Sequence, residues 1–312
     1  MRSIIKPVNQ SNGRRFIVQT AIFLCVLFVI DRGLSLLLES GLRRYWGLES
    51  PCTLLVVGHS RAILGIDEEM ITSRLGRPTA KYAVNGATTH DRVAMVQHYI
   101  AQHPGVRCVI YDVEASTFAS RGLSANSYGL FFPLMGDEIM GKYVRKHVAS
   151  SFELGVRRVF HTARFDETTF SLAIRGLLGI RKNLKIDNLS AARLQNQIAS
   201  GRVRKPAIDE NNLRAFEDMA RDLGDRGILL VLVDMPAVDK VNATNPKGSE
   251  EVRALFRRIA AAPHIFYLDY HDLYEVDYGL FHDGIHLNVN GKRAFTERLL
   301  EDLSSHLVRQ SF

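Results

Sequence analysis

The sequence predicts a doubly wound α/β fold with a mainly parallel sheet. Short runs rich in β-branched residues alternate with amphipathic stretches, in the order β-α-β-α-β, an interruption, then α-β-α-β-α. Runs such as Leu54–Val57 and Ile228–Val233 contain no polar residue, which is typical of strands covered by helices on both faces. With 312 residues, 46% of them hydrophobic, the chain is long enough for one large domain with an insertion.

The expected elements follow from these periodicities. We expect strands at 53–57, 81–84, 108–113, 228–234 and 265–270. We expect helices at 67–75, 89–102, 210–226, 249–261 and 290–307. The interval 120–207 is poor in strand-like runs, with helical segments around 140–158 and 165–178. We therefore expect an α/β domain made of residues 45–119 and 208–312, interrupted by a helical cap at 120–207.

The N-terminus is a candidate membrane anchor. Residues 16–30 are apolar except Gln19 and Thr20, and basic residues precede them. These fifteen residues cover about 22 Å as a helix, less than the roughly 30 Å of a bilayer core, and continuation to Leu38 supplies the missing length. Asp31 and Arg32 would then lie near the outer interface or pair with a partner helix.

We therefore expect residues 1–15 to form a cytoplasmic tail and 16–38 a single-pass anchor in the inner (cytoplasmic) membrane. The rest would face the periplasm or the extracellular side, although Arg43 and Arg44 oppose this orientation. A cleavable signal is less consistent with the sequence because no small-x-small site follows the apolar run. A buried core helix is the other alternative.

Charge and cysteine content restrict the partners. The net charge of +7 predicts attraction to anionic surfaces such as phospholipid headgroups, acidic glycans or nucleic acid. Much of this charge lies in the cap, where it could bind a polyanion or form an ordinary solvated helix surface. The basic residues of the cap include Lys142, Arg145, Lys146, Arg157, Arg158, Arg181, Lys182 and Lys185. The three cysteines have neither CxxC spacing nor an even count, so no zinc ribbon or disulfide framework is indicated.

The first segment suited to chemistry is the end of the first expected strand. Ser60 follows Gly58 by two residues and precedes an expected helix. Ligands of open α/β sheets bind beyond the carboxyl ends of strands, where a serine hydroxyl is exposed and backbone amides can hold an oxyanion. Taken alone, such a serine is as readily a helix cap.

Two further segments reach the same sheet edge. Asp283 and His286 are three residues apart after the last strand, so one turn can place the carboxylate beside the imidazole, although such a pair also occurs in ordinary surface turns. Asn85 and Gly86 follow the second strand, where they are candidate oxyanion donors or simply a strand-to-helix turn. Only the conjunction of all three segments predicts a serine acyl-transfer site.

This ordered set resembles the SGNH (GDSL-type) hydrolase superfamily. Gly58-His-Ser60 is similar to its nucleophile block, Asn85-Gly86 to its glycine block and Asp283-Gly-Ile-His286 to its Asp-x-x-His block. The resemblance covers about residues 52–307 and implies a flavodoxin-like three-layer sandwich. It also implies that Ser60 is the nucleophile, His286 the general base and acid, and Asp283 the orienting acid, with the amides of Ser60 and Gly86 as oxyanion donors.

The chain departs from that pattern at two places. His59 stands where the superfamily usually has Asp, and the third strand leads into Tyr111-Asp-Val-Glu114 rather than a Gly-x-Asn-Asp block. In the superfamily the asparagine of this block normally donates to the oxyanion, and losing one such donor typically lowers the rate by about 10² to 10³. Asp112 and Glu114 are candidates to bind substrate hydroxyls or are merely solvated at the strand end, and His59 and Arg61 are further candidate substrate contacts.

Competing sites have less support in the sequence. His282, Asp283 and His286 could in principle hold zinc or iron, but there is no HExxH motif, so we expect no metal and no cofactor. No phosphate-binding glycine motif follows any strand. The absence of a recognisable reading module, with the expected export, argues against nucleic acid.

The sequence thus predicts an exported serine acyltransferase that acts on a polysaccharide or other hydroxylated substrate. Anchored members of the superfamily with similar departures, which resemble alginate O-acetylation and teichoic-acid D-alanylation proteins, modify exported polysaccharides. The expected reaction is O-acetylation of a cell-envelope or secreted polysaccharide, with a multi-span membrane acyltransferase as a possible partner. An esterase using the same triad and a non-catalytic glycan-binding or assembly subunit are the alternatives.

Overall fold

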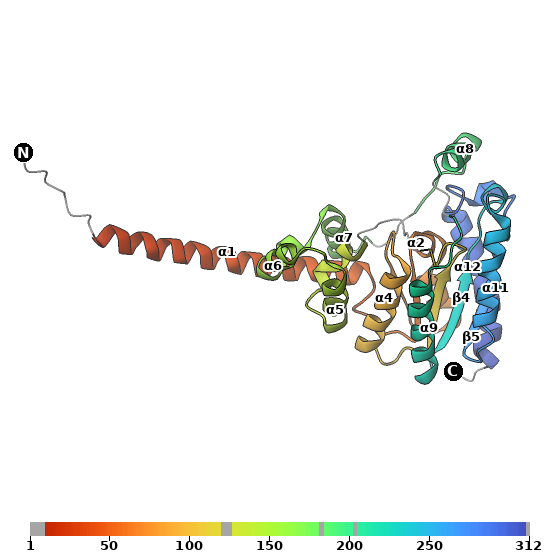
Figure 1. Ribbon diagram of the computed structural model, residues 1–312, viewed down its shortest axis with the longest axis horizontal. Helices are drawn as coiled ribbons and strands as arrows, with labels where there is room; N and C mark the ends of the chain where they lie inside the picture. Colours follow the sequence, from red (N-terminus) through yellow and green to blue (C-terminus); the bar gives the residue numbers. More distant parts are fainter. Residues whose placement is uncertain (1–9, 120–126, 181–183, 202–204, 310–312) are drawn as a thin grey trace, which may run out of the picture.

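The protein has a five-stranded, all-parallel sheet with helices on both faces (Figure 1). A computed structural model describes residues 10–119, 127–180, 184–201 and 205–309. The strands are β1 (Leu54–Gly58), β2 (Thr79–Ala83), β3 (Cys108–Val113), β4 (Leu229–Asp234) and β5 (Ile265–Asp269). Their order in the sheet is β2-β1-β3-β4-β5, which is the order of a doubly wound, flavodoxin-like sheet. The predicted fold class is therefore confirmed.

Alternate residues of each strand enter different cores. Leu55 and Val57 of β1 pack into one core and Leu54 and Val56 into the other. The first core is completed by α4 (Thr89–Gln102), α9 (Glu210–Asp225) and α11 (Pro246–Ile259), and the second by α3 (Glu68–Leu75) and α12 (Val289–Arg309). Both faces of β1, β3 and β4 are buried, which explains why these strand sequences show no polar alternation.

The described parts of the segment between β3 and α9 are mainly helical; the helices within residues 138–177 lie beside α1, whereas the helix at 191–199 lies apart from them (Figure 1). The described elements there are η1 (Ser127–Leu134), α5 (Glu138–His147), α6 (Ser151–Val159), η2 (Thr162–Arg164), α7 (Glu167–Leu177) and α8 (Ala191–Ala199). The expected segment at 140–158 is two helices, because the Ser150 hydroxyl accepts from the Glu153 amide and starts α6 anew. Arg181 and Lys182 lie outside the described residues.

The N-terminal helix α1 is a single helix from Gln10 to Tyr45 that projects away from the sheet (Figure 1). Within it, Gly13–Tyr45 is long and apolar enough to cross a membrane, with a mean hydropathy of 2.3 in its most apolar window. The side chains of residues 16–30 are exposed, so the alternative of a buried core helix is wrong for this stretch. Past this stretch the helix packs on the domain, where Ser35, Leu38 and Leu42 are buried.

Candidate active site

Ser60 lies in a tight connection between β1 and the short helix α2 (Ser60–Gly65). The strand ends at Gly58, where a Cβ atom would overlap the side chains of Ala62 and Asp112. Glycine is therefore needed for the helix to start this close to the sheet. Ser60 is the first residue of α2, so its amide has no acceptor within the helix.

Asp283 and His286 lie in a tight turn that follows η3 (Tyr278–Leu280). The ends of the turn pair through an antiparallel bridge between Phe281 and Leu287. Asp283 Oδ1 accepts the amides of Ile285 and His286, both at 3.0 Å. Its other oxygen, Oδ2, lies 2.8 Å from His286 Nδ1. The backbone of the turn therefore fixes the carboxylate, and the carboxylate fixes the imidazole.

The imidazole reaches the serine across 226 residues of sequence: His286 Nε2 is 2.8 Å from Ser60 Oγ. Since Asp283 accepts the proton on Nδ1, Nε2 is the nitrogen that can take a proton from the hydroxyl. Burial alone would raise the pKa of the Asp283 carboxyl, but the hydrogen bond and charge of His286, with the two amide donors, hold that pKa below its usual range. The carboxylate thus stays ionised beside the imidazole.

Asn85 and Gly86 follow β2 beside the same edge. The Val84 amide donates to the Gly58 carbonyl at 3.1 Å, which ties this turn to the end of β1. Gly86 has a φ of 77°, a conformation that favours glycine. Asn85 lines a cavity with Ser60, so its side chain has access to the space beside the nucleophile. Their role as oxyanion donors stays a prediction.

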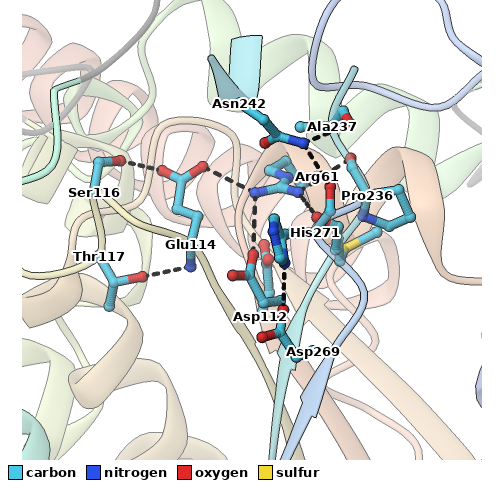
Figure 2. Close-up of polar contacts among 12 residues, drawn as sticks. Arg61, Asp112, Glu114, Ser116, Thr117, Pro236, Ala237, Asn242, Asp269 and His271 are labelled. Carbon is cyan, nitrogen blue, oxygen red and sulfur yellow. Dashed lines mark hydrogen bonds and ion pairs between the residues drawn. The ribbon is translucent and has the colours of Figure 1, made fainter. Parts of the chain in front are cut away.

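The four residues predicted to bind substrate form a buried polar network instead of an open surface. Figure 2 shows Arg61, Asp112 and Glu114 of this network. The Arg61 guanidinium lies 3.3 Å from Glu114 Oε2 and 3.2 Å from the Pro236 carbonyl, and it also donates to the Met235 carbonyl. His59 Nδ1 accepts the Arg61 amide at 3.3 Å. Arg61 therefore joins the loops after β1, β3 and β4 directly behind the nucleophile.

Asp112 requires a correction. Its side chain has no exposed surface and its Oδ2 lies 3.5 Å from His59 Nδ1, so it is not solvated at the strand end. The reason is that β3 is the central strand, and His59, which follows the neighbouring strand β1, donates its amide to Asp112 Oδ2. Its predicted contact with substrate stays a prediction. Glu114, His59 and Arg61 do line a cavity beside Ser60, although each is at least nine-tenths buried.

Two cavities meet at the serine. The Arg61 cavity, of about 250 Å³, lies on the β4 side, and its lining includes Arg61, Glu114, Gln197 and Asn242. The Arg175 cavity, of about 540 Å³, lies on the cap side, and its lining includes Asn85, Arg175, Leu184 and Lys185. Ser60, Asp283 and His286 line both. The nucleophile is therefore accessible from two sides.

Two residues of the Arg61 cavity were not predicted from the sequence. Asp234 ends β4, and burial, reinforced by the negative charge of Asp269 against the opposing charge of Arg61, raises its pKa to about 7. Gln197 of α8 accepts the Gly284 amide at 2.8 Å, so the cap is bonded to the turn that holds the imidazole. The position of Asp234 at a strand end was a signal that could have identified it; Gln197 offered none.

The three residues considered as alternative metal ligands, His282, Asp283 and His286, do not surround a common point. His282 Nδ1 instead lies 2.6 Å from Asp187 Oδ1. In the described ranges, no three His, Cys, Asp or Glu side chains are arranged to hold a metal ion. Cys25, Cys52 and Cys108 are free thiols.

No protein-family model and no curated protein matches the chain. Among solved structures, it is similar to a protein provisionally described as a platelet activating factor from Streptococcus pneumoniae, at 11% identity over 92% of this chain and 99% of that one, with a TM-score of 0.40. A provisionally assigned acylhydrolase from Bacteroides fragilis matches at 9% identity over 85% and 94%, with a TM-score of 0.42. A family two carbohydrate esterase from Clostridium thermocellum matches at 8% identity over 83% and 66%, with a TM-score of 0.39.

Proposed function

We propose that the protein is an exported, membrane-anchored serine enzyme that transfers an acyl group, acetyl in the simplest case, to hydroxyls of a cell-envelope or secreted polysaccharide. The observation that carries the proposal is the chain of two 2.8 Å contacts from Asp283 through His286 to Ser60. This arrangement activates a serine hydroxyl, which is otherwise a weak nucleophile at neutral pH. The inner-membrane location with the domain on the periplasmic or extracellular side belongs to the same proposal.

The reaction would proceed through an acyl-enzyme. Ser60 Oγ attacks the carbonyl carbon of the acyl donor while His286 Nε2 takes its proton. The tetrahedral intermediate collapses, the leaving oxygen takes that proton from His286, and an ester on Ser60 remains. An acceptor hydroxyl then gives its proton to His286 Nε2 and attacks the same carbonyl carbon. When this second intermediate collapses, Ser60 Oγ leaves and recovers the proton.

The two cavities favour transfer over hydrolysis. A hydrolase needs room for one organic substrate, whereas a transferase must present a donor and an acceptor to the same serine. The Arg61 and Arg175 cavities approach Ser60 from different sides. Arg175 and Lys185 give the larger cavity positive charge, which suits an anionic polymer or an anionic acyl donor. A multi-span membrane acyltransferase is the partner that we propose to deliver the acyl group.

The test is a covalent adduct. We expect the full-length protein in detergent, incubated with p-nitrophenyl acetate, to gain one acetyl group on Ser60 by mass spectrometry. Ser60→Ala should lose the adduct and about 10³-fold or more of the turnover, because the nucleophile is gone. Ser305→Ala, an exposed serine on α12, is the matched control and should keep both.

Adding an oligosaccharide separates the remaining alternatives. Acetylated oligosaccharide that depends on Ser60 supports transfer, whereas acetate release with no acetylated product identifies an esterase. Absence of any Ser60-dependent turnover would favour a non-catalytic glycan-binding or assembly subunit.

A further inference from the structure

Exposed apolar side chains outside α1 gather in one part of the chain. Among the residues that the structure describes, eleven large hydrophobic side chains outside α1 are exposed, and nine of these belong to residues 152–186. They are Phe152, Val159, Phe160, Phe170, Ile174, Leu178, Ile180, Leu184 and Ile186. Scattered exposure of single apolar residues is normal, but a concentration such as this marks an interaction surface.

The helix α6 and the residue that follows it make up the part of this surface nearest the free end of α1 (Figure 1). None of the residues of α6 is buried, and Phe152 is 80% exposed, Val159 53% and the adjoining Phe160 56%. The last turn carries Arg157 and Arg158, of which Arg158 is exposed. A short helix with exposed aromatic and basic residues is typical of segments that lie in a membrane–water interface.

The end of α6 is bonded to α1 at the point where the free apolar stretch stops. Asp31 accepts the amides of His161 and Thr162 at 2.8 and 2.9 Å, and also the Thr162 hydroxyl. Arg32 donates to the Val159 carbonyl at 2.9 Å. These bonds fix the height of α6 along α1. They also satisfy two charged groups that would be costly to leave facing lipid alone.

The length of the apolar stretch places this height inside the outer leaflet, about 9 Å below its outer boundary. Residues 16–30 cover about 22 Å, roughly 8 Å less than a bilayer core. Leu34, Leu36 and Leu37 are again exposed, so the apolar surface of α1 resumes immediately after the Asp31–Arg32 pair. A hydrophobic span that extends to Leu37 reaches about 33 Å, which matches the core. Val159 and Phe160, bonded beside residues 31 and 32, then lie within this thickness.

We propose that α6 and Phe160 form a second membrane contact, lying in the outer leaflet interface of the bilayer that α1 spans. Phe152, Val159 and Phe160 insert among the acyl chains, and Arg158 lies at the lipid phosphates. The proposal rests on the membrane anchor of the proposed function and is independent of the chemistry at Ser60. Its consequence is that α1 and α6 together hold the catalytic domain at a fixed height and orientation above the lipid.

Depth-dependent quenching tests this directly. The full chain carrying Phe160→Trp, or separately Phe152→Trp, is reconstituted into phosphatidylcholine–phosphatidylglycerol vesicles whose acyl chains are brominated. Bromine quenches tryptophan only at close range, and the native Trp46 is buried and common to all variants, so its signal can be subtracted. We expect the added tryptophans to be quenched at least about twofold more than one introduced by Val276→Trp, because they lie among the acyl chains.

Val276 is the matched control, since it is 76% exposed and lies in the loop after β5. Val26→Trp in the exposed part of α1 reports the anchor itself. If Val26→Trp is quenched while both α6 variants behave as Val276→Trp does, the bilayer is not the partner of α6 and the proposal is overturned, with the anchor intact. If Val26→Trp also escapes quenching, the anchor is wrong and the proposal fails with it.

Discussion

At the scale of single residues, the buried arginine behind the nucleophile faces more negative charge than it can neutralise. Arg61 lies 3.3 Å from Glu114 and 3.9 Å from Asp234, with Asp112 also close enough to act on it. Burial opposes its charge, but these three carboxylates together raise its pKa, so Arg61 stays protonated. Burial, with the negative charge of Asp269, raises the pKa of Asp234 to about 7 against the opposing charge of Arg61, so Asp234 keeps a proton near neutrality.

This predicts a specific dependence of stability on pH. The folded-state pKa of Asp234 is raised from 3.8 to about 7, so between these values the folded state holds a proton that the unfolded state has lost. Stability should therefore fall as pH rises from about 4 to about 7, by up to about 1.4 kcal/mol per unit, and this loss should then level off. Asp234→Asn cannot ionise, so its urea midpoint relative to the native protein should rise between pH 5 and pH 8.

The control is Asp218→Asn, because the Asp218 side chain is 60% exposed and its ion pair with Arg221 lies on the surface. Its midpoint should follow that of the native protein across the same range. Parallel curves for Asp234→Asn and the native protein would show that the proton is held elsewhere in the network.

At the scale of elements, α1 and α7 cross at two glycines. A Cβ atom on Gly176 would overlap the Gly41 carbonyl oxygen, and one on Gly41 would overlap the Ala173 carbonyl. The two helix backbones therefore approach more closely than side chains would allow. This contact attaches the cap to α1, and α7 also contributes Arg175 to the larger cavity.

The close crossing predicts that replacing glycine by alanine changes the free energy of unfolding in opposite directions at two positions. Gly176→Ala should lower the free energy of unfolding by about 1–3 kcal/mol, because the helices must separate to accommodate the methyl group. Gly155→Ala in α6 meets no atom within 4 Å and should instead raise stability by roughly 0.5–1 kcal/mol through the better helix propensity of alanine. Urea unfolding of the two variants measures the difference. Equal shifts of the same sign would contradict a close crossing.

The elements also show what could be predicted from the sequence. Apolar runs located β1, β3 and β4, which are buried along their whole length and therefore give a strong sequence signal. The edge strand β2 (Thr79–Ala83) contains Lys81 and begins two residues before its expected start. Boundaries set by local caps were harder: α11 begins at Pro246, capped by Asn245, three residues before its expected start. The Asp283–His286 pair beside Ser60 was predictable because the two residues are only three apart in the sequence. The network around Arg61 was not, because Glu114 and Asp234 meet it only through the strand order.

At the scale of the whole molecule, α1 joins the exposed apolar stretch, the candidate membrane anchor, to the folded domain. Its first half is exposed, whereas Leu38 and Leu42 are 2% and 0% exposed and pack in the same core as the sheet. A domain boundary at residue 45, as the sequence suggested, would cut away this packed half. The cap would then lose the helix on which α7 lies.

This predicts how truncations behave. A fragment of residues 31–312 keeps Leu38, Leu42 and the bonds of Asp31, so it should unfold in one cooperative transition. A fragment of residues 45–312 should be less stable by several kcal/mol, since burial of each leucine side chain contributes about 1.5–3 kcal/mol. Guanidinium unfolding followed by circular dichroism compares the two. The shorter fragment should also acylate Ser60 more slowly, because α7 and its Arg175 would no longer be held against the site. Equal stability of the two fragments would mean that the packed half of α1 contributes nothing to the domain.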